Sequence, residues 1–171
     1  MPHLSQHATM DNFMVSLIRD HQRYLPIVEY LDNVIQGVSE LTWDECERIG
    51  LEMGGQNCSE FCAGIRAGLV GALQDESENS KRDITALLTF ASKVNEASDA
   101  ITEQDISAVR DAGWNDQTVE DVIGLVSVFK VYSILANGFG FEALPSQAFA
   151  EMGQATVKMD GYTPMFKSFI E

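Results

Sequence analysis

The stretch QNCSEFCAGIR (residues 56–66) holds the residues of this chain that are most able to do chemistry. Cys58 and Cys62 lie four residues apart, one residue further than the CxxC spacing of redox motifs. A cysteine thiolate attacks peroxides, and a second thiol then condenses with the sulfenic acid that forms. The alternative interpretation is two reduced core residues at the start of a helix, because free cysteine is among the most buried residue types.

Charged residues near the two cysteines fit the first interpretation. Arg66 lies four residues after Cys62 on the same face of a helix, where its charge favours the thiolate. Arginine stays protonated in proteins and cannot shuttle a proton as histidine does. Glu47 can act as the base if its helix packs against that of Cys62. The same two charges can instead pair in a structural salt bridge. Cys46 points to another face of its helix and is interpreted as a core residue.

Other residue patterns that could support catalysis or metal binding are weak. His3 and His7 have a metal-compatible spacing but lie in a terminal stretch without supporting ligands, so they are interpreted as part of a tail. The chain contains no Gly-rich phosphate loop, nucleophile elbow or zinc spacing. We therefore expect neither a metal nor a cofactor.

The composition limits the partners and the compartment. The net charge of -15 disfavours nucleic acid and membrane surfaces as partners. No signal peptide is recognisable at the N-terminus. The longest apolar stretch, residues 122–139, is broken by Lys130 and is expected to fall short of a membrane span. Three cysteines are too few for a disulfide scaffold, so we expect a cytoplasmic protein with reduced thiols.

Helical periodicity recurs along the whole chain, and no stretch alternates with the period of a strand. The predicted fold class is therefore all-α, with about seven to eight helices joined by short capped connections. Pro26 is placed in the first turn of the second helix, and residues 75–83 are a polar connector. Asn115 caps a long helix that is apolar on nearly all sides, which favours a buried position or an oligomer interface.

Two predicted caps position the cysteines. Thr42 and Glu45 have the spacing of a capping box, which predicts a helix that carries Glu47. Asn57 and Glu60 have the same spacing and predict the start of the next helix. In that case Cys58 is the first helical residue, and it shares one helix with Cys62.

The order of these motifs resembles the carboxymuconolactone decarboxylase / AhpD-like family, specifically its peroxidase-related branch. The resemblance rests on LTWDECERIGLEMGGQNCSEFCAGIR (residues 41–66) and on residues 86–142, from ALLTFASKVNEAS to YSILANGFGFE. It covers roughly residues 22–142. It implies an AhpD-like domain in residues 21–142, with an N-terminal extension or helix in 1–20. The remaining residues, 143–171, form a C-terminal helix and tail that packs on the same domain or on a neighbouring subunit.

The site pattern of the family is a Glu followed by N-x-C-x-[YF]-C-x-x-x-H. Four residues match it, namely Glu47, Asn57, Phe61 and Cys62. The first cysteine of the pattern falls on Ser59 rather than on Cys58, and the histidine falls on Arg66. Two site residues are therefore replaced, and Cys58 stands beside one of the vacated positions.

The resemblance implies an antioxidant, thiol-dependent (hydro)peroxidase or oxidoreductase with an altered site. In this hypothesis Cys62 is the reactive thiol, Glu47 the proton relay, Cys58 a displaced resolving thiol and Arg66 an electrostatic substitute for the histidine. The partners are a peroxide, a thiol reductant and further copies of the chain in a trimer or hexamer. The alternative is a non-redox family member in which Arg66 anchors a small carboxylic acid or a lactone, or a catalytically inactive oligomer.

Overall fold

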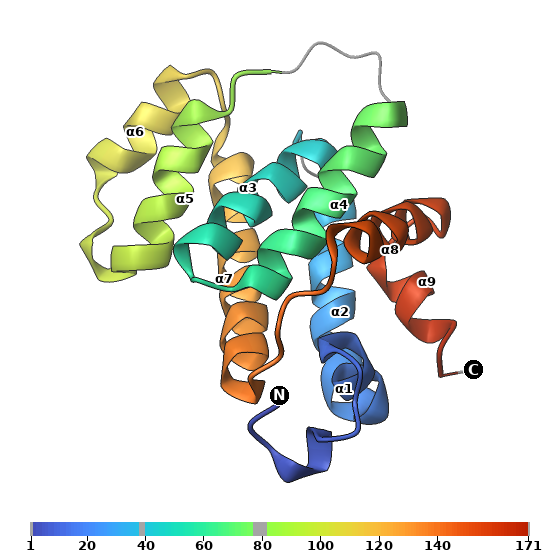
Figure 1. Cartoon of the computed structure of the whole chain (residues 1–171). Helices are drawn as coiled ribbons and strands as arrows, with labels where there is room; N and C mark the ends of the chain where they lie inside the picture. The colour runs from blue at the N-terminus through green and yellow to red at the C-terminus, as the bar shows by residue number, and fades with distance from the viewer. Residues whose placement is uncertain (1, 38–39, 77–81, 171) are drawn as a thin grey trace.

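Nine α-helices and two short 3₁₀ helices make up the computed structural model (Figure 1), which describes residues 2–37, 40–76 and 82–170. No strand occurs among these residues, and eight of the α-helices have seven residues or more, so the all-α prediction is confirmed. The middle of the predicted connector, residues 77–81, lies outside the described residues. The helices are α1 (Phe13–Arg19), α2 (His21–Gln36), α3 (Trp43–Gln56), α4 (Glu60–Glu76), α5 (Thr85–Ala97), α6 (Glu103–Asp111), α7 (Asp116–Phe139), α8 (Ser146–Lys158) and α9 (Tyr162–Lys167).

The long helix α7 lies at the centre of the bundle and packs against α2, α3, α4 and α5. Figure 1 shows the pair α5 and α6 on the opposite side of the bundle from α8 and α9. By length and mean hydropathy (1.6), α7 is apolar enough to cross a membrane, which differs from the sequence-based expectation. Half of its most apolar window is nevertheless buried inside the protein, as expected for a core helix.

The helices α4 and α8 approach each other closely because glycines face the contact. A Cβ atom on Gly68 would lie 2.2 Å from the carbonyl oxygen of Phe149, and one on Gly153 would lie 2.4 Å from the carbonyl carbon of Gly68. No side chain larger than hydrogen fits at either position. The contact fixes α8 against the helix that carries Cys62.

Most of the predicted caps are confirmed. Thr42 and Glu45 form a capping box, in which the Thr42 N–H group donates to the Glu45 carboxylate at 2.8 Å. A second capping box starts α6, and the Asn115 side chain caps α7. The placement of Pro26 was wrong. The break between α1 and α2 lies at Asp20, whose non-helical backbone separates them, and Pro26 lies inside α2.

The segment after α8 docks on α2. The carboxylate of Asp32, in α2, accepts the backbone N–H groups of Tyr162 and Thr163 at the start of α9. Phe166 in α9 is completely buried. This docking brings Tyr162 and Met165 next to α4, where the candidate site lies.

Candidate active site

The turn between α3 and α4 differs from its prediction. Asn57 ends α3, since its backbone N–H group donates to the carbonyl of Met53 at 2.9 Å, and α4 begins at Glu60. Cys58 has a φ angle of 49°, the left-handed conformation, and its side chain is exposed. The prediction that Cys58 is the first helical residue was therefore wrong. Cys62 lies in the first turn of α4, near the positive end of the helix dipole.

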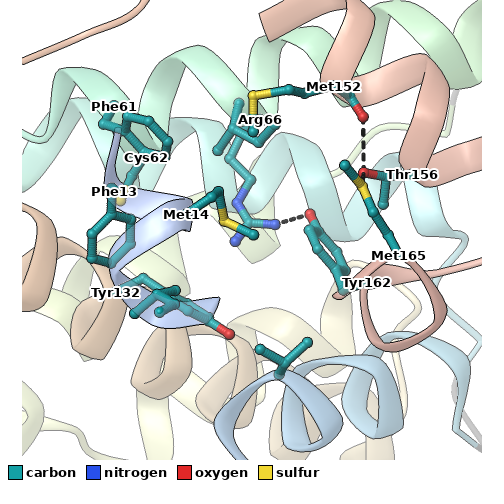
Figure 2. A pocket seen from close by; sticks show the side chains of 13 residues that line it. Phe13, Met14, Phe61, Cys62, Arg66, Tyr132, Met152, Thr156, Tyr162 and Met165 are labelled. Atoms are coloured by element: carbon teal, nitrogen blue, oxygen red, sulfur yellow. Dashed lines mark hydrogen bonds between the residues drawn. The ribbon is translucent and has the colours of Figure 1, made fainter. Parts of the chain in front are cut away.

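A cavity lies beside Cys62, between α1, α2, α4, α7, α8 and α9. Its volume is about 50 Å³. The side chains that line it are mainly aliphatic, aromatic or methionine, and Figure 2 shows them around the Arg66 guanidinium. The polar or thiol-bearing side chains in the lining are Cys62, Arg66, Tyr132, Thr156 and Tyr162.

Arg66, which lines the cavity, forms a buried ion pair with Glu47, which does not line it. Arg66 Nη1 lies 3.0 Å from Glu47 Oε2, and the exposed fractions of the two side chains are 5% and 0%. Of the two arrangements that the sequence allows for Glu47 and Arg66, the structure therefore contains the salt bridge. Burial alone would lower the pKa of Arg66, but the charge of the Glu47 carboxylate and its hydrogen bond raise the pKa above its ordinary value. The guanidinium stays charged and cannot give up a proton.

Tyr162 joins the ion pair from α9. Its hydroxyl donates to Glu47 Oε1 at 2.7 Å and accepts from Arg66 Nη1, as Figure 2 shows for the latter bond. The indole N–H of Trp43 donates to the same carboxylate oxygen at 2.9 Å. Burial, and then Glu47, raise the pKa of Tyr162 well above its ordinary value, so the hydroxyl keeps its proton. Both oxygens of Glu47 are occupied, and Glu47 does not line the cavity.

Aromatic rings and a glycine fix the position of the guanidinium. Its carbon lies 4.3 Å from the centre of the Phe129 ring and 5.0 Å from that of Tyr162, within the range of cation–π contacts. A Cβ atom on Gly50 would lie 2.8 Å from the Phe129 ring and 3.2 Å from Arg66 Cδ. The missing side chain at Gly50 leaves the space that Arg66 and Phe129 fill against α3.

The structure brings some of the predicted site residues together and separates others. Cys62 and Arg66 line one cavity, and Glu47, outside the lining, forms a salt bridge with Arg66. Ser59 is buried, and its hydroxyl has no hydrogen-bond partner among the described residues. Ser59 and Cys58 both lie outside the cavity lining.

Sequence reasoning missed Trp43, Tyr132 and Tyr162. Trp43 lies four residues before Glu47, a spacing that places both on one face of the predicted helix and could have indicated the contact. Tyr132 was assigned to the apolar core of α7. Tyr162 lies in the predicted C-terminal helix and tail, and no local spacing connects it to Glu47, 115 residues away.

No group of three or more His, Cys, Asp or Glu side chains in the described part of the chain is arranged to hold a metal ion. The polar groups at the cavity are instead a thiol, a fixed cation, two phenols and the hydroxyl of Thr156. This set can favour a thiolate and donate hydrogen bonds to an oxygen atom.

Comparison with known proteins identifies a solved structure with a similar fold. The chain is similar to a solved structure described as the alkylhydroperoxidase AhpD core, an uncharacterized peroxidase-related protein from Ralstonia eutropha JMP134. The two chains are 22% identical, with a TM-score of 0.69 over 81% of this chain and 78% of that chain. No family model and no curated protein matches the sequence. The likeness shows that this chain has the AhpD-like all-α fold.

Proposed function

We propose that this chain is an AhpD-like thiol-dependent peroxidase, an oxidoreductase in which Cys62 is the reactive thiol. The observation that carries the proposal is the position of Cys62, which lines a small cavity one helical turn from the fixed guanidinium of Arg66. The fold of a peroxidase-related protein supports the same reaction class. Fold alone does not define an activity, so the site is the main argument.

In the proposed reaction the Cys62 thiolate attacks the terminal oxygen of a hydroperoxide, ROOH. The S–O bond forms as the O–O bond breaks, and RO⁻ leaves and takes a proton from water. The sulfur is oxidised by two electrons to a sulfenic acid, and the peroxide is reduced to an alcohol or to water. This step needs a thiolate, and Cys62 lies at the start of α4 and shares the cavity with the Arg66 guanidinium.

A thiol from outside the chain would complete the cycle. Cys58 lies on an exposed turn, and neither Cys58 nor the buried Cys46 lines the cavity. A thiol reductant would condense with the sulfenic acid, releasing water, and a second thiol would then free Cys62 as the reductant becomes a disulfide. This cycle needs a reducing compartment, so we place the protein in the cytoplasm.

The arrangement of Arg66 does not favour the non-redox alternative. One side of the guanidinium already pairs with Glu47, and the cavity of about 50 Å³ leaves little space for a lactone or an aromatic acid. Assembly with further copies of the chain remains part of the proposal. One face of α7 exposes Ile123, Val131 and Ile134, and apolar patches of this kind mark interaction surfaces.

Dimedone trapping tests the proposed function. The reduced protein is treated with hydrogen peroxide, and sulfenic acids are located by mass spectrometry after reaction with dimedone. We expect the adduct on Cys62 in the parent and in Cys58→Ser and Cys46→Ser, and peroxide consumption only where Cys62 is present. If Cys62→Ser consumes peroxide as fast as the parent, the proposal fails.

A further inference from the structure

The N-terminal segment, which the sequence predicts to be a tail, is docked on the end of α7. The backbone N–H group of His3 donates to the carbonyl of Phe139 at 2.7 Å. A short 3₁₀ helix (Ser5–His7) follows, and the His7 ring at its end is 2% exposed. The centroid of this ring lies 4.6 Å from that of Phe139 and 5.7 Å from that of Phe141. His7 is therefore the buried anchor of the segment.

The surroundings of His7 suit a neutral imidazole and disfavour a charged one. Its Nδ1 atom is buried and has no hydrogen-bond partner among the described residues. The charged group that acts on the ring is Arg19 of α1, whose Nη1 also donates to the Gln6 carbonyl at 3.4 Å. Glu142 follows Phe141 in the chain, but no carboxylate in the described part of the chain contributes to the pKa of His7. Burial, and then Arg19, lower that pKa, so the docked ring resists protonation.

The two phenylalanine rings that contact His7 also contact the wall of the cavity. Phe13, at the start of α1, lines the cavity, and its ring centroid lies 6.1 Å from that of Phe139 and 6.2 Å from that of Phe141. The same ring lies 5.4 Å from Phe61, which also lines the cavity. Aromatic pairs at these separations stabilise one another. A displacement of His7 therefore reaches the cavity wall through one intermediate ring.

We propose that residues 3–10 form a pH-sensitive strap, which neutral His7 docks on the end of α7 and which protonation of His7 releases. Protonation places a charge among apolar rings beside Arg19, without a counterion in the described part of the chain. The imidazolium is therefore stabilised when the segment leaves and exposes the ring to water. Release also removes one packing partner of Phe139 and Phe141, so the cavity wall at Phe13 becomes looser. The inference does not depend on peroxide chemistry.

Hydrogen exchange tests the release of the strap. The amides of Ala8 and Met10 donate to the carbonyls of Ser5 and His7, so their protection factors report the ordered segment. Between pH 7.5 and 5.5 these factors should fall by roughly three- to tenfold. An undocked imidazole with the ordinary pKa of 6.5 is charged about ten times more often than neutral at pH 5.5, which sets the upper value. The amides of α7 should keep their protection, which distinguishes release from unfolding.

Two variants assign the effect to one ring. His7→Phe keeps an aromatic side chain that does not titrate, so its segment should stay protected at both pH values. His3→Gln is the matched control in the same segment and should release as the parent does. Iodoacetamide reports on the cavity wall. The ratio of Cys62 to Cys58 labelling at pH 5.5 should be about twofold or more higher in the parent than in His7→Phe, because a looser wall exposes Cys62 more often.

Titration of the His7 ring by NMR gives a reading that needs no variant. The ring should take up its proton below pH 6.5, over the range in which the amides of the strap lose protection. A strap that stays protected at pH 5.5 overturns the inference, and so does an equal loss of protection in His7→Phe. An equal labelling ratio in the two proteins overturns the link to the cavity. Failure of the dimedone experiment would instead overturn the proposed function and leave the strap in place.

Discussion

The carboxylate of Asp32 accepts the backbone N–H group of Tyr162 at 2.9 Å, across 130 residues of sequence. Its second oxygen accepts the N–H group of Thr163, so one side chain of α2 binds the start of α9. We predict that Asp32→Asn weakens this docking, because an amide offers one acceptor and turns an N–H donor toward the other backbone N–H. The cost should be about 1–3 kcal/mol of unfolding free energy.

Hydrogen exchange measures the same docking directly. In Asp32→Asn the amides of α9 should lose protection, while those of α3 and α7 keep it. Asn33→Ala, at an exposed neighbouring position of α2, is the control and should leave α9 unchanged. Equal protection of α9 in both variants would show that Asp32 does not hold the segment.

The buried pair of Glu47 and Arg66 predicts a large stability effect. Glu47→Gln leaves the Arg66 guanidinium charged and buried without its counterion, which typically costs about 3–5 kcal/mol. Urea denaturation of the variant measures this loss. Glu52→Gln, on an exposed face of the same helix, should change the unfolding free energy by less than about 0.5 kcal/mol. Similar losses in both variants would contradict a specific role of the pair.

The contact of α4 with α8 predicts opposite effects of one substitution at two positions. Gly68→Ala puts a methyl group 2.2 Å from the Phe149 carbonyl oxygen, and we expect a loss of about 1–3 kcal/mol. Gly71→Ala, one turn further along α4, meets no atom within 4 Å and should gain up to about 1 kcal/mol from helix propensity. Thermal unfolding measures the stability of the two variants. A Gly68→Ala variant more stable than the parent would contradict the close contact between α4 and α8.

The three cysteines should differ in their reaction with iodoacetamide. Cys58 is exposed and should be alkylated first, and Cys62, at the cavity, should follow. Burial, and then the Glu47 and Glu45 carboxylates, raise the pKa of the Cys46 thiol far above its ordinary value. Cys46 should therefore stay unmodified until the protein unfolds. Mass spectrometry after timed quenching gives the order, and early labelling of Cys46 would disprove it.

His7 predicts a dependence of stability on pH. The ring is 2% exposed and packs 4.6 Å from Phe139, between centroids. Burial, and then the charge of Arg19, lower the pKa of His7 below its ordinary value of 6.5. The unfolded chain therefore binds a proton more readily than the folded one, so stability falls as the pH drops through about 6.5. His7→Phe should show a smaller drop in unfolding free energy between pH 7.5 and 5.5 than the parent does.

Features that depend on neighbouring residues could be predicted from the sequence. The capping box of Thr42 and Glu45 spans three residues, and its side-chain geometry follows from that spacing alone. The predicted cap at Asn57 was wrong because asparagine suits both ends of a helix and tolerates turn conformations. The close return of the chain after α3 uses Asn57 as the C-cap and places Cys58 in the left-handed region.

Contacts between distant segments limited the prediction of the site. The motif alignment placed Glu47 and Arg66 near each other, and they lie 19 residues apart in the sequence. Tyr162 reaches the same carboxylate only because Asp32 docks α9 on α2, and no periodicity encodes that docking. The cavity also depends on where α1, α7, α8 and α9 meet, which sequence patterns of single helices do not describe.

The helix α9, which completes the cavity lining, is the last helix to be synthesised. The cavity takes Met14 from α1, Cys62 from α4 and Tyr132 from α7, and Tyr162 and Met165 of α9 complete its lining. A nascent chain that ends after α8 would therefore lack these two lining residues, and the Glu47 carboxylate would lack one of its donors. The lining around Cys62 is therefore complete only after α9 (Tyr162–Lys167), the last helix in chain order, has been synthesised and has docked on α2.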